Sequence, residues 1–467
     1  MTSLTFYGGV NEVGGNKILL EDKDTKIFLD FGMSFTARGK YFEEYLKPRS
    51  SNGLVDFITM GLLPDLEGIY RTDLLEKAGK KEESVQIDAV LLSHAHADHA
   101  NYISFLHKDI PIYMGHTTHN LLKAIQERSP SSIEQEILEF NENGSKRGAP
   151  KIQRKINEFS SGKKFKIGSL EIEPIHVDHS VPGAYGFIIY TSSGPVVYTG
   201  DLRRHGTKLE MTEEFIESAK SCKPIALLAE GTRIADEPTN ESEHLVFQES
   251  DKLASGTDKT IFADFNFKDV DRVRTFYDVA KRNGRKLVVR IPDCFYLKYF
   301  HQDKTLDMPN FDDPDILIFK HKTRTGTYSD SDYYGGQRFF ATQENTITAA
   351  EISKNPGKYL CALGFYYFGS LIDIKPSTGT PYIHSASEPW DEEQEIAQER
   401  VNNWLNKFGM NKYQIHCSGH AKGSDLMNIV KEIDAKILFP IHSEHPTEYA
   451  RITNKITIVD EGKKYQL

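Results

Sequence analysis

The stretch Ser93-His94-Ala95-His96-Ala97-Asp98-His99 decides the fold of this 467-residue chain. It follows the largely apolar run 87–92, which predicts a buried strand, and it precedes a segment, 100–106, with apolar residues at helical intervals. Three imidazoles and a carboxylate therefore lie in a tight turn at the carboxyl end of a strand, where ligands collect in layered α/β folds. Such side chains suit zinc or a similar divalent ion. His94 and His96 can bind one ion from one side, while Asp98 and His99 point elsewhere and can hold a second.

Composition describes a globular protein of two or three domains. The content of 39% hydrophobic and 27% charged residues is ordinary. No apolar run is long enough to cross a membrane, and we expect no N-terminal signal peptide. A net charge of −10 argues mildly against a nucleic-acid partner, although a basic groove can lie on an acidic body. The cysteines have no paired spacing, so we expect no disulfide framework and a reducing, cytoplasmic setting: they are Cys222, Cys294, Cys361 and Cys417.

The motif His-x-His-x-Asp-His after a strand resembles the metal motif of the metallo-β-lactamase fold, an αββα sandwich with one or two metal ions at its edge. Two predicted hairpins, over 164–175 and 185–198, would supply the second half of such a sandwich. The opening segment 8–16, Gly-Gly-Val-Asn-Glu-Val-Gly-Gly-Asn, with Asp30 after the next strands, resembles ribonuclease J and its relatives. Its glycines either form a hairpin with positive φ or bring the backbone close to the metal site. Asp30 is expected to buttress a metal-binding loop.

Three further metal ligands follow from the same reasoning. Asp201, directly after a strand and a glycine, is well placed to bridge two ions. The segment 177–183 contains His-Ser-x-Pro, which resembles the ribonuclease J motif and implies His179 as the third ligand beside His94 and His96; His176 is the rival. His442, after the apolar segment 437–441, is implied as the last ligand of the second ion, together with Asp98, His99 and Asp201.

Glu230, His420 and His442 together resemble motifs A, B and C of the β-CASP nucleases, in which a cap domain is inserted between motifs A and B. The interval between Glu230 and His420 contains a predicted β-α-β unit, with a strand at 260–265, a helix at 270–283 and a strand at 287–291. We therefore predict an α/β protein in which residues 1–235 and 412–467 form the metallo-β-lactamase core and residues 236–411 form the inserted β-CASP domain.

The resemblance, which covers nearly the whole chain, implies a ribonuclease J-like enzyme. It would bind two divalent ions, with zinc as the default and manganese as the alternative, and hydrolyse RNA by metal-activated hydroxide. The implied mode is 5′→3′ exonuclease, with endonuclease activity as a further possibility, on single-stranded RNA with a 5′-monophosphate end. No membrane partner is expected, and a homodimer remains open. Candidate catalytic residues are Asp98, His420 as stabiliser of the attacked phosphate or proton donor, and Glu230 as the residue that orients His420.

Candidate substrate contacts rest on weaker signals. Ser418, Gly419 and Ala421 either bind a neighbouring phosphate through backbone N–H groups at a helix start or serve as turn and cap. Arg233 and Lys422 are candidate phosphate ligands, and further basic residues offered for the same role are Arg203, Arg204, Arg272, Arg274, Arg285 and Lys286.

Alternative functions remain open. A DNA-directed β-CASP nuclease has the same motifs, because the choice of RNA depends on the surroundings of the 2′-OH. Glu230 stands where ribonuclease J usually carries aspartate, and in this it resembles the RNA 3′-processing endonucleases. A hydrolase of small esters would not need motifs A to C, and an inactive scaffold subunit would have lost ligands, none of which is missing here.

Overall fold

The computed structural model describes residues 1–467 except 44, 130–131, 143–149, 238 and 388–391. The chain forms two compact units. The first consists of Met1–Arg204, Lys208–Thr239 and Gly419–Leu467, and the second of His205–Thr207 and Asn240–Ser418. The second unit thus runs from Asn240 to Ser418, where the sequence analysis has 236–411, and it also takes in the three residues His205–Thr207.

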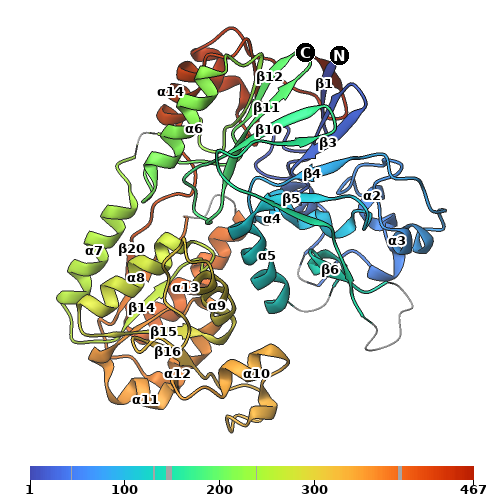
Figure 1. Ribbon diagram of the computed structural model, residues 1–467. Helices are drawn as coiled ribbons and strands as arrows, with labels where there is room; N and C mark the ends of the chain where they lie inside the picture. Colours follow the sequence, from blue (N-terminus) through green and yellow to red (C-terminus); the bar gives the residue numbers. More distant parts are fainter. Residues whose placement is uncertain (44, 130–131, 143–149, 238, 388–391) are drawn as a thin grey trace. The chain divides into compact units, whose positions relative to one another are not determined.

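Two stacked β-sheets build the first unit (Figure 1). One has the strand order β22-β1-β2-β3-β4-β5-β8: β22 (Lys464–Gln466), β1 (Thr2–Phe6), β2 (Ile18–Asp22), β3 (Thr25–Leu29), β4 (Ala89–Leu91), β5 (Ile112–Gly115) and β8 (Ile156–Phe159). The other has the order β21-β13-β12-β11-β10-β9: β21 (Ile437–Ile441), β13 (Ala226–Glu230), β12 (Gly194–Tyr198), β11 (Tyr185–Thr191), β10 (Leu170–His176) and β9 (Phe165–Ile167). The pairs β9–β10 and β11–β12 are the two predicted hairpins.

The core of this unit lies between the sheets. Alternate residues of facing strands, such as Leu29 and Leu91 on one sheet and Leu228 on the other, belong to one buried apolar cluster. Helices α6 (Leu209–Ser221) and α14 (Gly423–Ile433) cover the outer face of the second sheet with a further cluster, as Figure 1 shows. Helix α5 (His116–Arg128) packs against β5 and β8 of the first sheet. The layers are those of the predicted αββα sandwich, which is confirmed.

The second unit is a seven-stranded parallel sheet with helices on both faces. Its order is β17-β16-β15-β18-β14-β19-β20, and every pair is parallel. The strands are β14 (Ile261–Asp264), β15 (Lys286–Arg290), β16 (Ile316–Phe319), β17 (Thr346–Ile347), β18 (Tyr359–Cys361), β19 (Pro381–His384) and β20 (Asn411–Gln414). The main helices are α7 (Glu243–Ser255), α8 (Val270–Arg282), α9 (Cys294–Gln302), α11 (Ala349–Lys354), α12 (Leu371–Ile374) and α13 (Glu392–Phe408). Strand β14, helix α8 and strand β15 are the predicted β-α-β unit.

Sequence periodicity also predicts a helix over 131–140, and this prediction is wrong. The described part of that segment holds a single 3-10 turn, Ile133–Gln135, and the strand β6 (Glu139–Phe140), which pairs with β7 (Ile152–Gln153). The Phe140 ring lies 3.8 Å from the guanidinium carbon of Arg71. This tertiary contact and the strand pairing outweigh the local helical pattern.

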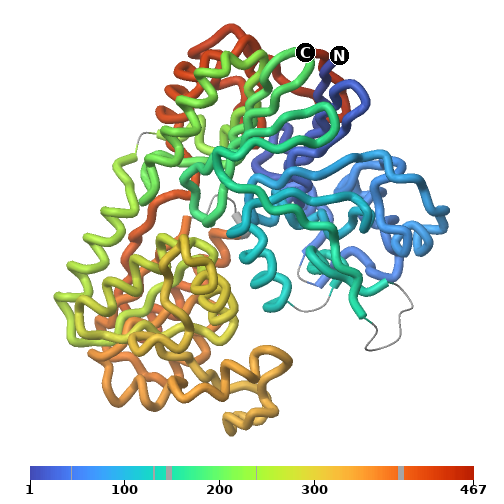
Figure 2. Tube along the Cα trace, in the orientation of Figure 1, coloured from blue at the N-terminus to red at the C-terminus, as the bar shows by residue number. Residues whose placement is uncertain are grey.

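The two ends of the chain meet in the first unit. Strands β1 and β22 pair in antiparallel register, with Leu4 opposite Tyr465, and Figure 2 shows the N- and C-terminal ends of the tube side by side. Among the residues that the structure describes, every helix is too short or too polar to cross a membrane.

Candidate metal centre

The candidate site residues follow the ends of strands at one edge of the sandwich. His94 and His96 follow β4, His179 follows β10, Asp201 follows β12, and His442 follows β21 directly. Strands β12, β13 and β21 are parallel neighbours, so their carboxyl ends reach the same edge. Asp98 and His99 lie in the short helix α4 (Ala97–Ala100), which begins after His96.

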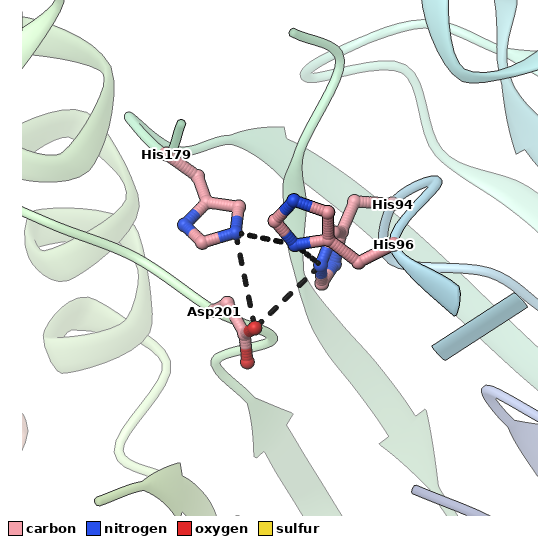
Figure 3. A group of neighbouring side chains, drawn as sticks. All are labelled: His94, His96, His179 and Asp201. Carbon is pink, nitrogen blue, oxygen red and sulfur yellow. Dashed lines mark hydrogen bonds and ion pairs between the residues drawn. The ribbon is translucent and has the colours of Figure 1, made fainter. Parts of the chain in front are cut away.

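Figure 3 shows the first group of possible ligands, His94, His96, His179 and Asp201. His96 Nδ1 lies 3.1 Å from both His94 Nε2 and His179 Nε2. Asp201 Oδ2 lies 3.5 Å from His94 Nε2 and 3.8 Å from His179 Nε2. Tetrahedral ligands at zinc–nitrogen distances are about 3.3 Å apart, so this spacing suits one zinc-sized ion. His176 is in none of the ligand groups found among the described residues; its ring packs on Tyr185, with centroids 4.2 Å apart.

A second group consists of Asp98, His99 and His442. His442 Nε2 lies 3.2 Å and His99 Nε2 lies 3.8 Å from Asp98 Oδ2. Asp201 Oδ2 is near this group too, 3.2 Å from His99 Nε2 and 3.8 Å from His442 Nε2. One carboxylate thus stands between the two groups, as the bridging role predicted for Asp201 requires.

Hydrogen bonds on the far side of the rings direct the ring nitrogens into the site. Nδ1 of His179 donates to Gly419 O at 2.5 Å, and Nδ1 of His99 donates to Asp30 Oδ2 at 2.7 Å. The hydroxyl of Thr232 donates to Glu230 Oε2 at 2.8 Å, so it accepts from His442 Nδ1 at 2.8 Å. Each of these rings therefore presents the Nε2 lone pair to the site, which is the tautomer that a metal ligand needs.

This donor set fits divalent cations. Both carboxylate oxygens of Asp201 and Nε2 of His99 are buried without a hydrogen-bond partner among the described residues. The nitrogens of His94, His96 and His179 meet at 3.1 Å, where a single proton satisfies only one contact. Burial of such groups is unfavourable without a partner, and a cation in each group would provide one for all of them.

The electrostatics point the same way. Burial and the neighbouring imidazoles hold the pKa of His94 well below its usual value, so the ring is neutral. Burial would raise the pKa of Asp201, but the imidazoles of His442 and His99 outweigh it and the pKa is lowered. A neutral imidazole at His94 and an ionised carboxylate at Asp201 are the protonation states that metal binding selects. At His99 burial would lower the pKa, but the carboxylates of Asp201, Asp30 and Asp98 outweigh it and raise the pKa, so this position attracts positive charge, which a divalent cation would also supply.

Asp30 supports the histidine turn, as predicted. Its Oδ1 accepts from Ser93 N at 2.6 Å, and its Oδ2 accepts from Ser93 Oγ, His99 Nδ1 and Tyr198 Oη at 2.6, 2.7 and 2.5 Å. Tyr198 in turn accepts from Asn16 Nδ2 at 3.0 Å. This buried network fixes both the turn and the ring of His99. The sequence analysis missed Tyr198, because a tyrosine inside an apolar strand carries no local sign of such a role.

The glycine-rich segment 8–16 approaches the site closely. Gly9 O accepts from His442 N at 2.8 Å, and Asn16 N donates to Asp98 O at 3.0 Å. Gly14 has φ +86°, and a Cβ there would lie 2.7 Å from Asp98 Oδ2. The glycine is therefore needed both for its backbone conformation and for the space that Asp98 occupies.

Glu230 and His420 form a hydrogen-bonded pair beside Asp201. His420 Nδ1 lies 3.1 Å from Glu230 Oε2 and 3.9 Å from Asp201 Oδ2. Burial would lower the pKa of His420, but these two carboxylates outweigh it and raise the pKa to about 9. Glu230 also accepts from Leu202 N at 2.9 Å. Thr232, which the sequence analysis missed, lies between the rings of His420 and His442, with its hydroxyl 3.2 and 2.8 Å from their Nδ1 atoms.

Several residues that the sequence analysis offered as phosphate contacts are buried or already bonded to other groups of the protein. Ala421 N donates to Leu202 O at 2.7 Å, so this N–H group is already used. Arg203, Arg272 and Arg285 are buried, and Arg203 pairs with Asp178 at 2.9 Å. Sequence shows the charge of such residues but not their burial.

The remaining candidates lie nearer the surface. Lys422 precedes α14 as its N-cap residue. Arg233 pairs with Asp236, with Nε 2.6 Å from Oδ2. Ser418 and Gly419 lie directly before His420, and their carbonyls accept from His205 and His179.

Comparison with known families identifies two domains. Residues 64–252 match a β-lactamase superfamily domain, and residues 408–451 match a Zn-dependent metallo-hydrolase RNA specificity domain. The second match contains His416, His420 and His442 and covers the segment that the motif analysis assigned to motifs B and C.

Individual relatives cover nearly the whole chain. Ribonuclease J of Mycoplasma genitalium is 23% identical over 95% of this chain and 68% of its own length. Ribonuclease J 2 of Streptococcus pyogenes is 22% identical over 97% and 72%, and ribonuclease J of Thermus thermophilus is 23% identical over 98% and 73%. A crystal structure of a protein of unknown function from Enterococcus faecalis V583 covers all of both chains with a TM-score of 0.77 at 23% identity, which shows a shared fold.

Proposed function

Because this chain is a ribonuclease J-like protein of the metallo-β-lactamase superfamily, we propose that it hydrolyses phosphodiester bonds in RNA as a metal-dependent ribonuclease. The observation that carries the proposal is the position of Asp201 between two groups of possible ligands, next to the His420–Glu230 pair. A small-ester hydrolase has no need of that pair.

The proposed ligands follow the two groups. His94, His96 and His179 would hold the first ion and Asp98, His99 and His442 the second, with Asp201 as a ligand available to both. Zinc is the proposed metal, because imidazole and carboxylate ligands at this spacing suit it; manganese is the alternative. When bound there, such ions would supply a lowered pKa for an attacking water and positive charge opposite the scissile phosphate.

His420 is the proposed contact to the attacked phosphate. Glu230 holds Nδ1 of the ring and favours the charged imidazolium, so we assign Nε2 to the phosphate, as a charge stabiliser and as proton donor to the leaving oxygen. Thr232 supports the same arrangement, since its hydroxyl binds Glu230 and lies against both His420 and His442. Asp98 contributes as a ligand of the second ion.

The finer features of the proposal rest on the resemblance of the sequence motifs to those of ribonuclease J. By this resemblance we propose the 5′→3′ exonuclease mode, with endonuclease activity as a further possibility, a preference for a single-stranded 5′-monophosphate end and a cytoplasmic location, and we leave a homodimer open. The four cysteines, all within the described residues, are free thiols, which suits a reducing compartment.

The test uses one RNA strand with a 5′-monophosphate or a 5′-triphosphate, labelled at either end, and a DNA strand of the same sequence. Wild type should release mononucleotides from the 5′-monophosphate RNA, and His420→Ala should lose at least about a hundredfold in rate. His176→Ala is the matched control, because that ring lies outside the ligand groups, and should cleave at the wild-type rate. Internal fragments alone would favour an endonuclease, faster cleavage of DNA a deoxyribonuclease, and no cleavage of any strand with metal-loaded protein would refute the proposal.

A further inference from the structure

The backbone before His420 is held by side chains at three successive carbonyls. Cys417 O accepts from Arg272 Nη2 at 3.2 Å, Ser418 O accepts from His205 Nε2 at 2.9 Å, and Gly419 O accepts from His179 Nδ1 at 2.5 Å. Loop carbonyls usually bond to water or to other backbone groups. Three consecutive side-chain donors leave this segment little freedom to shift.

Arg272 is the buried anchor of the arrangement. Its side chain is 1% exposed, and all three guanidinium nitrogens are engaged. Nε and Nη2 contact the two oxygens of Glu243 at 3.0 and 3.1 Å. Nη1 donates to Ser385 O at 2.9 Å and to His416 Nδ1 at 3.2 Å, and Ser385 Oγ donates onward to Ile415 O at 2.6 Å. Arg272 therefore holds residues 415–417 directly and through one intermediate.

Glu243 connects this anchor with His205. Its carboxylate binds Arg272 and also accepts from Cys417 Sγ at 3.3 Å, while its backbone N–H donates to His205 O at 3.1 Å. His205 belongs to the short piece His205–Thr207 of the second unit, which Thr207 fastens to Asp271 at 2.7 Å. The ring that holds Ser418 O is thus itself fixed.

Stability alone does not account for this network. A buried ion pair contributes little net stability compared with an apolar pair of similar volume, because both charges lose their hydration. A planar guanidinium, in contrast, offers five N–H groups in fixed directions. Here those directions coincide with the segment that leads into His420, the residue to which we assign the phosphate contact.

We propose that Arg272 and His205, both held by Glu243, are positioning residues that fix the backbone of residues 417–419 and thereby the location of His420 during phosphodiester cleavage. This inference rests on the proposed function. It assigns a role in the reaction to two side chains of the second unit that belong to none of the possible ligand groups found among the described residues.

Steady-state kinetics of two variants test the inference. Arg272→Lys keeps the positive charge but not the planar guanidinium with its several N–H donors. This variant should lower kcat about tenfold, with KM changed less than twofold and two ions per chain retained. His205→Phe should also lower kcat about tenfold, whereas His205→Gln, which keeps an N–H donor at the same reach, should stay within twofold of wild type. If the phenylalanine and glutamine variants have the same kcat, the positioning role of His205 is wrong.

Arg285→Lys is the matched control. Arg285 is another buried arginine of the second unit, and it donates to the carbonyls of Lys259, Tyr359 and Ala254 at 2.7, 3.3 and 3.3 Å. It precedes β15 and does not contact residues 415–418. The two lysine variants should lose similar stability, but only Arg272→Lys should lose kcat. An equal loss of kcat in both would mean that Arg272 acts through general stability and would overturn the inference.

A crystal structure of Arg272→Lys separates this inference from the proposed function, because it needs no activity. We expect the distance of 3.1 Å between His420 Nδ1 and Glu230 Oε2 to exceed hydrogen-bond reach in the variant. An unmoved His420 would overturn the inference even if the enzyme cleaves RNA, and a displaced one would support it even if RNA is not the substrate. Arg272 Nη1 also donates to Ser385 Oγ at 2.5 Å. Should Arg272→Lys not fold, Ser385→Ala takes its place with the same expected directions, because it removes this contact and the bond from Ser385 Oγ to Ile415 O.

Discussion

Replacement of Tyr198 by phenylalanine should weaken metal binding although Tyr198 touches no ion. The phenol is fully buried, and its hydroxyl donates to Asp30 Oδ2 at 2.5 Å and accepts from Asn16 Nδ2 at 3.0 Å. Burial and the charge of Asp30 raise the pKa of Tyr198 well above its usual value, so the hydroxyl keeps its proton and remains a donor. Asp30 in turn binds Nδ1 of His99, a proposed ligand of the second ion.

The magnitude follows from the contacts that remain. A hydrogen bond to a charged group is worth about 1.5–3 kcal/mol, and Asp30 keeps its three bonds to Ser93 and His99. We therefore take the lower end, about 1.5 kcal/mol, which corresponds to roughly a tenfold weaker second ion. The stranded amide of Asn16 adds a further cost of about 1–3 kcal/mol to the free energy of folding.

The assay is a zinc titration of metal-free protein against a chromophoric chelator, which yields the dissociation constant of each ion. Tyr382→Phe is the matched control, because Tyr382 is equally buried and donates to Asp264 Oδ2 at 3.1 Å in the second unit. It should lose stability but keep the wild-type zinc affinity. Zinc affinity within twofold of wild type in Tyr198→Phe, or equal weakening in both variants, would refute the reasoning.

Three other predictions follow from the same structure. His179→Ala should remove one ion of two, measured by elemental analysis, whereas His176→Ala should remove none; loss of an ion from both would contradict the ligand assignment. Gly14→Ala should displace Asp98 and lower zinc retention about tenfold on dialysis against chelator. Full retention would show that the backbone at residue 14 can accommodate a Cβ without displacing Asp98. Burial and the Arg272 guanidinium lower the pKa of His416 to about 4 from 6.5; the unfolded chain takes up this proton first, so the free energy of unfolding should fall between pH 6.5 and 4 by up to about 3 kcal/mol. Denaturant melts of His416→Gln should lack this component, and an unchanged pH slope would show that His416 does not contribute to it.

The proposed metal ligands could be predicted from sequence because they lie in short motifs that come soon after a strand end. The histidine turn after β4 and the Gly-Asp after β12 are local signals, and the structure brings these residues together. The supporting residues could not be found in that way. Thr232 and Tyr198 act through contacts with residues far away in the chain, and nothing in their local sequence distinguishes them from ordinary strand and turn residues.

Errors in the sequence analysis have the same origin. Arg272 reads as a surface charge on a helix, but Glu243 and Ser385, distant in sequence, enclose it. Segment 131–140 has apolar residues at helical intervals, yet Phe140 lies in strand β6 and its ring packs on the guanidinium of Arg71. Periodicity reports which residues are buried, and not which partner covers them.

Asp98 and His442 are hydrogen bonded across 344 residues of chain. At translation rates of about 5–20 residues per second, roughly 20–70 s pass between the synthesis of one and the synthesis of the other. A nascent chain can therefore assemble the four ligands around His94 long before it closes the pocket at His442. Growing polypeptides would therefore stay harmless to the message that encodes them until His442 has been synthesised and the second group of ligands is complete.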